Sequence, residues 1–335
     1  MGFQNVIIAT GSQVKPLPHV EFDHKVIIDS TDALKINQIP KTMLVIGGGY
    51  IGLELGSVYA SLGTKVSIAE MTSGFLPGTD RDLVAVFEKE NKGLFKAVYF
   101  DTKVEQVTVK NEKARVGFKT KDGKKEKNYD QVLVAIGRRP NSGSLDLENA
   151  NIKLDEDGFV KVDDRRRTNV ENIFAIGDLT GEPLLAHKAT HEGRVAAEVI
   201  AGRKGAAYDP RAIPGIVFTH PEIGWTGLTE SKAKERDIKI KVVKFPWSAS
   251  GRAATLGVGN GLTKLILEPD TGRILGAGVA GNQAGTLIAE ISHAIEMGSM
   301  AEDLALTIHP HPTLSETIME AAELFMGSPT HLPKP

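Results

Sequence analysis

The segment that most restricts how this chain can fold is residues 43–57, MLVIGGGYIGLELGS. An apolar β-strand pattern runs into a glycine turn and helical spacing follows, so Gly47, Gly49 and Gly52 stand at G-x-G-x-x-G between a strand and a helix. In that geometry Gly47 allows a tight turn, Gly49 lets the backbone approach a pyrophosphate on the helix N-terminus, and Gly52 lets helix and strand pack closely. The segment therefore predicts a dinucleotide-binding α/β unit rather than a glycine turn that binds nothing.

An acidic residue, Glu70, follows the next predicted strand, residues 65–69. A carboxylate at this position accepts hydrogen bonds from the adenosine ribose and repels a 2′-phosphate, so the sequence predicts NAD rather than NADP as the ligand. Glu54, on the first helical turn, has two interpretations: a surface carboxylate that compensates the helix dipole, or a contact near the nicotinamide. The sequence favours neither.

The charge and composition of the chain exclude several classes of protein. The formal net charge of the 335 residues is −2 and no long run of like charge occurs, so there is no case for nucleic acid or an anionic membrane as a partner. No apolar run approaches the ~18 residues of a membrane-spanning helix, and the N-terminus lacks the features of a signal peptide. Cysteine is absent, which excludes disulfides and thiolate metal ligands. We predict a cytoplasmic protein without a metal site.

The remaining pattern is that of an α/β chain followed by an α+β segment. Before residue 213, strands are predicted at 6–9, 43–46, 65–69, 97–100, 103–109, 114–119, 131–136 and 172–176, and helices at 50–62, 80–92 and 186–201. After it, strands are predicted at 238–244, 262–268 and 273–280, and helices at 284–297, 300–305 and 314–326. A turn is expected at 219–222, Asp80 or Thr79 is expected to cap the second helix, and the strand at 6–9 is expected to be buried.

The stretch IHPHPTLSE, residues 308–316, matches two patterns at once. Thr313 and Glu316 have the spacing of a capping box with Thr313 as N-cap, and the prolines keep the preceding residues out of the helix. The same turn places His311 within reach of Glu316. A carboxylate on one imidazole nitrogen fixes the tautomer and raises the basicity of the other nitrogen, which is the arrangement of a general base that can deprotonate a thiol.

Several motifs follow one another in an order that resembles a known family. ATGS, GGGYIGLE, TKVSIAE, VAIGRRPN, AIGD…LLAHKA…EG and HPHPTLSE are similar to the dihydrolipoyl dehydrogenases, the flavin-dependent E3 components of 2-oxoacid dehydrogenase complexes. The resemblance implies an α/β fold with a Rossmann-like NAD domain and a partial FAD domain, followed by an α+β dimerisation domain. The predicted segments are 1–38 as a remnant of the FAD domain, 39–141 as the NAD-binding domain, 142–211 as the return segment of the FAD domain, and 212–335 as the interface domain.

The resemblance also implies cofactor sites. NAD is expected to contact Gly47, Gly49, Tyr50, Gly52, Glu54, Glu70, Val104 and Gly137. FAD is expected to contact Thr10, Gly11, Ser12, Asp178, Leu185, Ala186 and His187, with Asp178 at the ribityl chain and residues 185–187 against the isoalloxazine ring.

The same resemblance assigns His311 as the catalytic base, Glu316 as its orienter and His309 as a structural neighbour. In the family this His–Glu pair serves the other subunit of a homodimer. It deprotonates dihydrolipoamide carried by a lipoyl domain, the thiolate attacks a redox disulfide, and electrons pass through FAD to NAD.

The sequence departs from the family pattern at its front. The family begins with roughly 100 or more further residues, about a domain's worth, which carry a first G-x-G-x-x-G for FAD and a C-x-x-x-x-C disulfide. Neither motif occurs in this sequence, and the strand at 6–9 is interpreted as part of a sheet whose other strands are missing. Two hypotheses follow: a dihydrolipoyl dehydrogenase that is inactive in this form, or a non-catalytic, NAD-binding and dimerising fragment of one. A glutathione-reductase-like enzyme fits Glu70 less well, and the sequence leaves open which 2-oxoacid complex is served.

Overall fold

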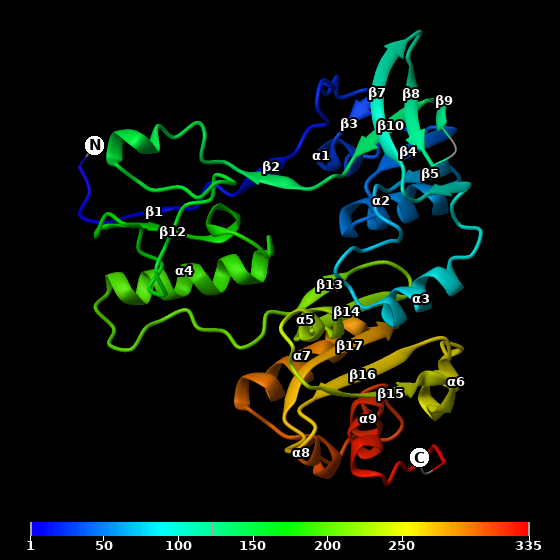
Figure 1. Ribbon diagram of the computed structural model, residues 1–335, viewed down its shortest axis with the longest axis vertical. Helices are drawn as coiled ribbons and strands as arrows, with labels where there is room; N and C mark the ends of the chain where they lie inside the picture. The colour runs from blue at the N-terminus through cyan, green and yellow to red at the C-terminus, as the bar shows by residue number, and fades with distance from the viewer. Residues whose placement is uncertain (1, 122, 334–335) are drawn as a thin grey trace. The chain divides into compact units, whose positions relative to one another are not determined.

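The computed structural model describes residues 2–121 and 123–333, which fold into two compact units (Figure 1). The first unit contains the chain up to Leu17 together with Ile136–Pro210, and the second contains Pro18–Ala135 and the chain from Arg211 onward. The predicted fold class is confirmed, because parallel and antiparallel sheets alternate with helices along the chain. The four segment boundaries drawn from the sequence are a different division and remain a prediction.

A parallel sheet forms the first part of the second unit. Its strands are β3 (Ile27–Ile28), β10 (Gln131–Val134), β4 (Thr42–Ile46), β5 (Lys65–Ala69) and β6 (Ala97–Tyr99), in that spatial order. All neighbouring strands in it run parallel. The middle strands are almost wholly buried, as expected when both faces of a parallel sheet are covered. The helices of this part are α1 (Ser30–Ala33), α2 (Tyr50–Ser61) and α3 (Arg81–Glu90).

A three-stranded antiparallel sheet follows in the same unit, made of β7 (Lys103–Lys110), β8 (Lys113–Thr120) and β9 (Gly123–Tyr129). The sequence predicted β7 and β8 and their antiparallel pairing, and both are confirmed. It missed β9, since GKKEKNY is exposed at every residue except the last and therefore has no apolar alternation. Backbone pairing with β8, from Ala114–Tyr129 to Thr120–Gly123, is what makes this polar segment a strand.

The interface part of the second unit is an antiparallel sheet covered by helices. Its strand order is β13 (Gly215–Val217), β14 (Glu222–Gly227), β17 (Ile274–Gly281), β16 (Leu262–Leu267) and β15 (Lys241–Pro246). The helices are α5 (Glu230–Glu235), α6 (Gly251–Leu256), α7 (Ala284–Met297), α8 (Ala301–Leu306) and α9 (Glu316–Met326). The predicted helices at 284–297, 300–305 and 314–326 are confirmed to within two residues at each end.

The sequence missed β13 and β14, because a turn was expected at 219–222 and β14 is rich in glycine. Gly224 lies close to another backbone in that strand: a Cβ there would be 3.2 Å from the carbonyl oxygen of Ala284, at the start of α7. A glycine inside a strand often marks such a close approach by another backbone. Tertiary packing therefore turned a poor strand sequence into the second strand of the sheet.

The first unit combines short strands with one long helix. β1 (Val6–Ile8) pairs in parallel with β12 (Ile173–Ala175), β2 (Ser12–Val14) pairs with β11 (Arg138–Pro140), and α4 spans Ala186–Ile200. The expectation of a buried strand at 6–9 is wrong: all of β1 is only partly buried, whereas β12 is fully buried. The other elements are the 3₁₀ helices Leu147–Ala150 and Gly177–Thr180 here and Trp247–Ala249 in the second unit.

A buried ion cluster joins α3 to the interface sheet within the second unit. The Lys264 side chain on β16 is 1% exposed, and its Nζ lies 2.6 Å from Asp80, 2.8 Å from Asp82 and 2.9 Å from Glu230. Asp80 is the N-cap residue of α3 by position, but its side chain does not cap the helix. The predicted N-cap position is therefore confirmed for Asp80, although its carboxylate binds Lys264 and not the helix N–H groups.

We expect Lys264→Met to lower the free energy of unfolding by about 3–5 kcal/mol at neutral pH, since it leaves carboxylates buried without their cation. Urea unfolding followed by tryptophan fluorescence measures this. Lys244→Met is the matched control: Lys244 also contacts Asp82 but is 43% exposed, so its loss should cost about 1 kcal/mol or less. Equal losses for the two variants would contradict the special role of Lys264.

The same cluster predicts a dependence on pH. Burial acts to raise the pKa of Asp82, but the hydrogen bonds from Lys244 and Lys264 outweigh it and hold that pKa below 3.8. A depressed carboxyl pKa stabilises the fold above 3.8, and this stabilisation is lost as the pH falls through the folded-state pKa. In Lys264→Met, the free energy of unfolding should therefore fall less steeply with acidification than in the wild type.

Candidate functional site

The glycine loop between β4 and α2 is shaped by close backbone contact. Gly47 has φ +109°, a conformation that favours glycine. A Cβ on Gly52 would lie 2.0 Å from the carbonyl oxygen of Gly47, whereas a Cβ on Gly49 would meet nothing within 4 Å. Gly49 is the N-cap residue of α2 and has no side chain to cap it. The loop therefore leaves open space in front of the first amide groups of α2, which is the cradle that a pyrophosphate requires.

Glu70 closes this loop from the neighbouring strand. Its Oε2 accepts a hydrogen bond from the Gly48 N–H at 2.6 Å, and its Oε1 accepts from the Thr72 N–H and hydroxyl at 2.7 and 2.8 Å. The residue is 7% exposed. A carboxylate has about four acceptor positions, so these bonds leave capacity for a ribose hydroxyl. The structure adds a role that the sequence did not predict, which is to hold the glycine loop in place.

The other residues of the predicted NAD site belong to several elements and to both units. Glu54 is partly buried and its Oε1 accepts a hydrogen bond from the Phe218 N–H at 2.8 Å, so it is more than a solvated surface carboxylate. Burial raises the pKa of Glu54, and the Phe218 hydrogen bond opposes this. Tyr50 starts α2 and is 39% exposed, and Val104 is buried in β7. Gly137 belongs to the first unit, where it has φ +112°.

The first unit brings together the residues predicted at the start of the FAD site. The Ser12 hydroxyl donates to Asp178 Oδ2, and Arg138 Nε donates to the Ser12 hydroxyl at 2.7 Å. Asn141 donates its side-chain amide to the Thr10 carbonyl at 2.9 Å and its backbone N–H to the Gly11 carbonyl at 2.9 Å. Arg138 and Asn141 lie within the motif VAIGRRPN, but no local pattern indicates their role. The pairing of β2 with β11 brings them to residues 10–12.

A buried charge network supports the turn that carries Asp178. Glu192 on α4 is fully buried, and its Oε2 accepts from the Gly177 N–H at 2.6 Å. Its Oε1 lies 3.0 Å from Arg166 and 3.1 Å from Lys188. Lys188 and Glu192 are four residues apart on α4, a spacing that could have indicated the pair from the sequence.

The predicted contact segment for the flavin ring lies at the start of the same helix. Leu185 is the N-cap residue of α4, and Ala186 and His187 are exposed in its first turn. The structure therefore places residues 185–187 directly after the loop from Asp178, on the helix that Glu192 anchors.

The His311–Glu316 pair is formed as the sequence suggested. His311 Nδ1 lies 2.8 Å from Glu316 Oε1, and the other carboxylate oxygen of Glu316 accepts from the Thr313 N–H at 2.7 Å. The His311 side chain is 72% exposed. Glu316 is thus held by the backbone and turns Nε2 of His311 into the nitrogen that can accept a proton.

The predicted capping box around this pair is only half present. Thr313 donates its hydroxyl to the Pro310 carbonyl at 2.7 Å instead of accepting from the helix, and the N-cap residue of α9 is Ser315. Thr313 as N-cap is therefore wrong, because the proline turn offers its hydroxyl a closer acceptor.

His309 differs from His311 in its surroundings. Its side chain is 4% exposed, with Nε2 2.8 Å from Glu290 and Nδ1 2.9 Å from the Thr307 carbonyl. Both ring nitrogens face acceptors of the protein, which supports a structural role for His309 and leaves the exposed His311 as the candidate base.

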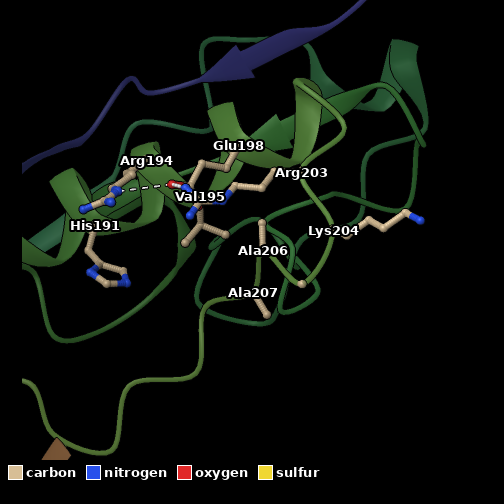
Figure 2. Close-up of a pocket in the computed structure, with 9 residues that line it drawn as sticks. His191, Arg194, Val195, Glu198, Arg203, Lys204, Ala206 and Ala207 are labelled. Atoms are coloured by element: carbon tan, nitrogen blue, oxygen red, sulfur yellow. Dashed lines mark hydrogen bonds and ion pairs between the residues drawn. The ribbon is translucent and has the colours of Figure 1, made fainter.

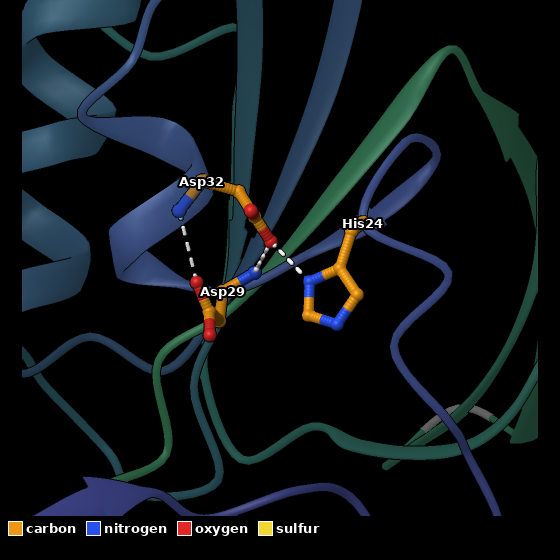
Figure 3. A group of neighbouring side chains, drawn as sticks. All are labelled: His24, Asp29 and Asp32. Carbon is orange, nitrogen blue, oxygen red and sulfur yellow. Dashed lines mark hydrogen bonds and ion pairs between the residues drawn. The ribbon is translucent and has the colours of Figure 1, made fainter.

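Two further clusters have local explanations. A cavity of about 390 Å³ along α4 is lined by His191, Arg194, Arg203 and Lys204, but Glu198 pairs with both arginines (Figure 2). In Figure 3, Asp29 and Asp32 form the capping box of α1, and His24 hydrogen-bonds to Asp32. That bond raises the pKa of His24. Glu198, both arginines, His24 and the two aspartates therefore have partners within the chain.

No helix among the described residues is both long enough and apolar enough to cross a membrane.

We expect Gly52→Ala to destabilise the fold and abolish NAD+ binding, because the new Cβ collides with the Gly47 carbonyl. Gly49→Ala is the matched control: its Cβ has free space, so the melting temperature should stay near that of the wild type while NAD+ affinity falls. Thermal unfolding and calorimetric titration with NAD+ separate the two effects. A stable Gly52→Ala variant with normal binding would contradict this account of the loop.

Comparison with known proteins places these features in one family pattern. Residues 1–193 match the family described as pyridine nucleotide-disulphide oxidoreductase, and residues 213–322 match the dimerisation domain of that family. The chain is 49% identical over 334 residues to a dihydrolipoyl dehydrogenase of Vibrio parahaemolyticus, covering 99% of this chain and 70% of the relative. It is 44% identical over 334 residues to the dihydrolipoyl dehydrogenase of Bacillus subtilis, with the same coverage.

Solved structures of related flavoproteins have the same fold as this chain. The crystal structure of LpdA from Mycobacterium tuberculosis superposes with a TM-score of 0.88 at 28% identity, covering 95% of this chain and 69% of that one. The HOCl-induced flavoprotein disulfide reductase RclA from Escherichia coli superposes with a TM-score of 0.85 at 30% identity, covering 96% and 73% of the two chains.

Proposed function

We propose that this chain, which belongs to the dihydrolipoyl dehydrogenases of the pyridine nucleotide-disulphide oxidoreductase family, carries the NAD site, part of the FAD site and the catalytic base of that enzyme. The observation that supports the base is the oriented His311–Glu316 pair, with Nδ1 of His311 2.8 Å from the Glu316 carboxylate. The observation that supports the NAD site is the open cradle at Gly49 between Gly47 and Gly52.

The chain has residues for the whole of the proposed NAD site but for only part of the FAD site. The glycine loop and Glu70 would hold NAD, which accepts a hydride when bound. Ser12, Arg138 and Asp178 form a polar cluster that would hold the ribityl chain of FAD. The chain has no cysteine, so the 335 residues do not supply the disulfide that the dithiol substrate needs.

His311 performs the step that this chain can supply. Its Nε2 takes a proton from a dihydrolipoamide thiol, whose pKa near about 8.5 is otherwise too high for ready ionisation at neutral pH. Glu316 fixes the tautomer and stabilises the imidazolium that forms. Thr313 holds Glu316 in position through its backbone N–H. After this step His311 is an imidazolium, which can return the proton later in the reaction.

The test is a chimera in which these residues replace the matching part of the Vibrio parahaemolyticus enzyme. The chimera should oxidise dihydrolipoamide, and His311→Gln should lower its turnover by roughly 10²–10⁴-fold while NAD+ binding is unchanged. The 335-residue chain alone should bind NAD+ without dihydrolipoamide turnover, as expected for the non-catalytic fragment. An inactive chimera, or lipoamide turnover with tightly bound flavin from the chain alone, would overturn the proposal.

We also propose that the chain forms a homodimer through the interface part. The match to the dimerisation domain supports this, and so does a set of exposed apolar side chains beside His311. Leu306 is 75% exposed and Ile308 is 96% exposed on the segment that leads to His311. A partner subunit that covers these side chains would place His311 close to the substrate site of that partner. The substrate as a lipoyl domain of a 2-oxoacid dehydrogenase complex, and the cytoplasm as location, are part of the same proposal.

Ile308→Asp should shift the chain toward monomer, because a charge at an apolar contact loses burial energy and costs desolvation. Analytical ultracentrifugation over a range of concentrations measures the dissociation constant. Ile238→Asp, at a position 39% exposed in the loop between α5 and β15, should leave the dissociation constant unchanged. A wild type that stays monomeric at high concentration would refute the homodimer.

A further inference from the structure

The chain after α9 folds back along that helix toward its first turn. α9 ends at Gly327, whose φ of +74° reverses the direction of the backbone. The Thr330 N–H and hydroxyl then donate to Glu323 at 2.9 and 2.8 Å. One turn nearer the start of the helix, Nδ1 of His331 pairs with Glu320, and the His331 N–H donates to the same carboxylate at 3.3 Å. The tail, residues 328–333, is therefore fastened to two carboxylates of α9.

Glu320 is a buried carboxylate whose charge has to be offset from within the protein. Its side chain is 2% exposed, whereas that of His331 is 51% exposed. Across the part of the chain that the structure describes, His331 is the only basic side chain paired with Glu320. A buried carboxylate without a partner is strongly disfavoured. The imidazolium form of His331 therefore supplies the positive charge that lets Glu320 remain ionised.

Glu320 is also a neighbour of the proposed catalytic pair. Glu316 and Glu320 are four residues apart on α9, so their side chains project from one face of the helix, a single turn apart. Like charges at this spacing repel each other. Glu316 is the carboxylate that lies 2.8 Å from Nδ1 of His311. A charge on Glu320 that no cation offsets would thus act on Glu316 and on the imidazole that Glu316 orients.

The charged groups that act on His331 come from the same row of carboxylates. The hydrogen bond with Glu320 raises the pKa of His331 against the opposing effect of burial, and the charges of Glu320, Glu316 and Glu323 raise it further. The field of Glu316 therefore reaches His331. The two histidines, His311 at the start of α9 and His331 on the tail, share one row of carboxylates.

We propose that His331 is a positioning residue for the catalytic pair: it offsets the charge of Glu320 and thereby sets the basicity of His311. The inference rests on the proposed role of His311 as the base. With His331 charged, Glu316 faces His311 without a second bare carboxylate one turn away. Without that cation, the added negative field favours the protonated form of His311, so the base is free to accept a proton only at higher pH.

The test is an NMR titration of the 335-residue chain with histidine labelled at Cε1, in which His311→Gln identifies the signal of His311. His331→Gln keeps a hydrogen-bond donor but removes the charge, so the titration midpoint of His311 should move up by about half a pH unit, the order expected of one partly solvated charge a helical turn away. His331→Lys keeps a cation beside Glu320 and should leave the midpoint near the wild-type value. The double variant Glu320→Gln, His331→Gln removes both charges and should restore it.

His24→Gln is the matched control. His24 also pairs with a carboxylate, that of Asp32, but at α1 in the parallel-sheet part of the unit. This variant should leave the titration of His311 unchanged. An unchanged midpoint in His331→Gln would overturn the proposal. An equal shift in the single and the double variant would overturn it too, because packing of the tail and not charge would then be responsible.

Turnover of the chimera tests the proposed base separately. His331→Gln should move the pH profile of kcat/KM to higher pH, since this profile reports the base of the free enzyme. A lower kcat with an unchanged profile would contradict the role of His331. If His311→Gln leaves the chimera fully active, the proposed base fails and His331 has no part in catalysis, even where the NMR titration shows the coupling.

Discussion

The close packing of α2 on the glycine loop is the constraint on which the candidate NAD site depends. The carbonyl oxygen of Gly47 occupies the space where a Cβ of residue 52 would lie, at 2.0 Å. Only glycine at that position lets the helix start so close to β4. The start of α2 in turn sets the direction of its free amide groups, the position of Glu54 one turn later, and the approach of Glu70 to the loop.

Side chains from neighbouring strands and loops then secure what the backbone has shaped. Glu70 binds Gly48 from the end of β5, and Phe218 binds Glu54 from the interface part of the same unit. In the first unit, Glu192 binds Gly177 in the same way and supports the turn of Asp178. In each case a carboxylate accepts a backbone N–H, which gives a charge-assisted bond and one orientation of a functional turn.

Two buried charge clusters fix how segments of each unit pack against one another. Lys264 and Glu192 are almost fully buried, and each has partners of opposite charge within about 3 Å. A buried charge without its partner is costly, so these pairs penalise any arrangement in which the segments do not meet. The cluster at Lys264 thus holds α3 against the interface sheet. The cluster at Glu192 holds α4 against the turn at Gly177.

Sequence alone determined the local features of this protein: the glycine loop, the helix that follows it, the His311–Glu316 pair and the order of motifs that marks the family. These depend on residues a few positions apart, whose geometry is set by φ, ψ and side-chain reach. Only the tertiary structure decided that β9 and β14 are strands, that Asp80 binds Lys264 instead of capping α3, and that Phe218 meets Glu54. The physical reason differs between them. β9 pairs with the neighbouring β8 but has no apolar alternation to mark it as a strand, whereas the partners of β14 on β17, of Asp80 and of Glu54 lie far apart in the chain, so their pairing follows from sheet register and strand order.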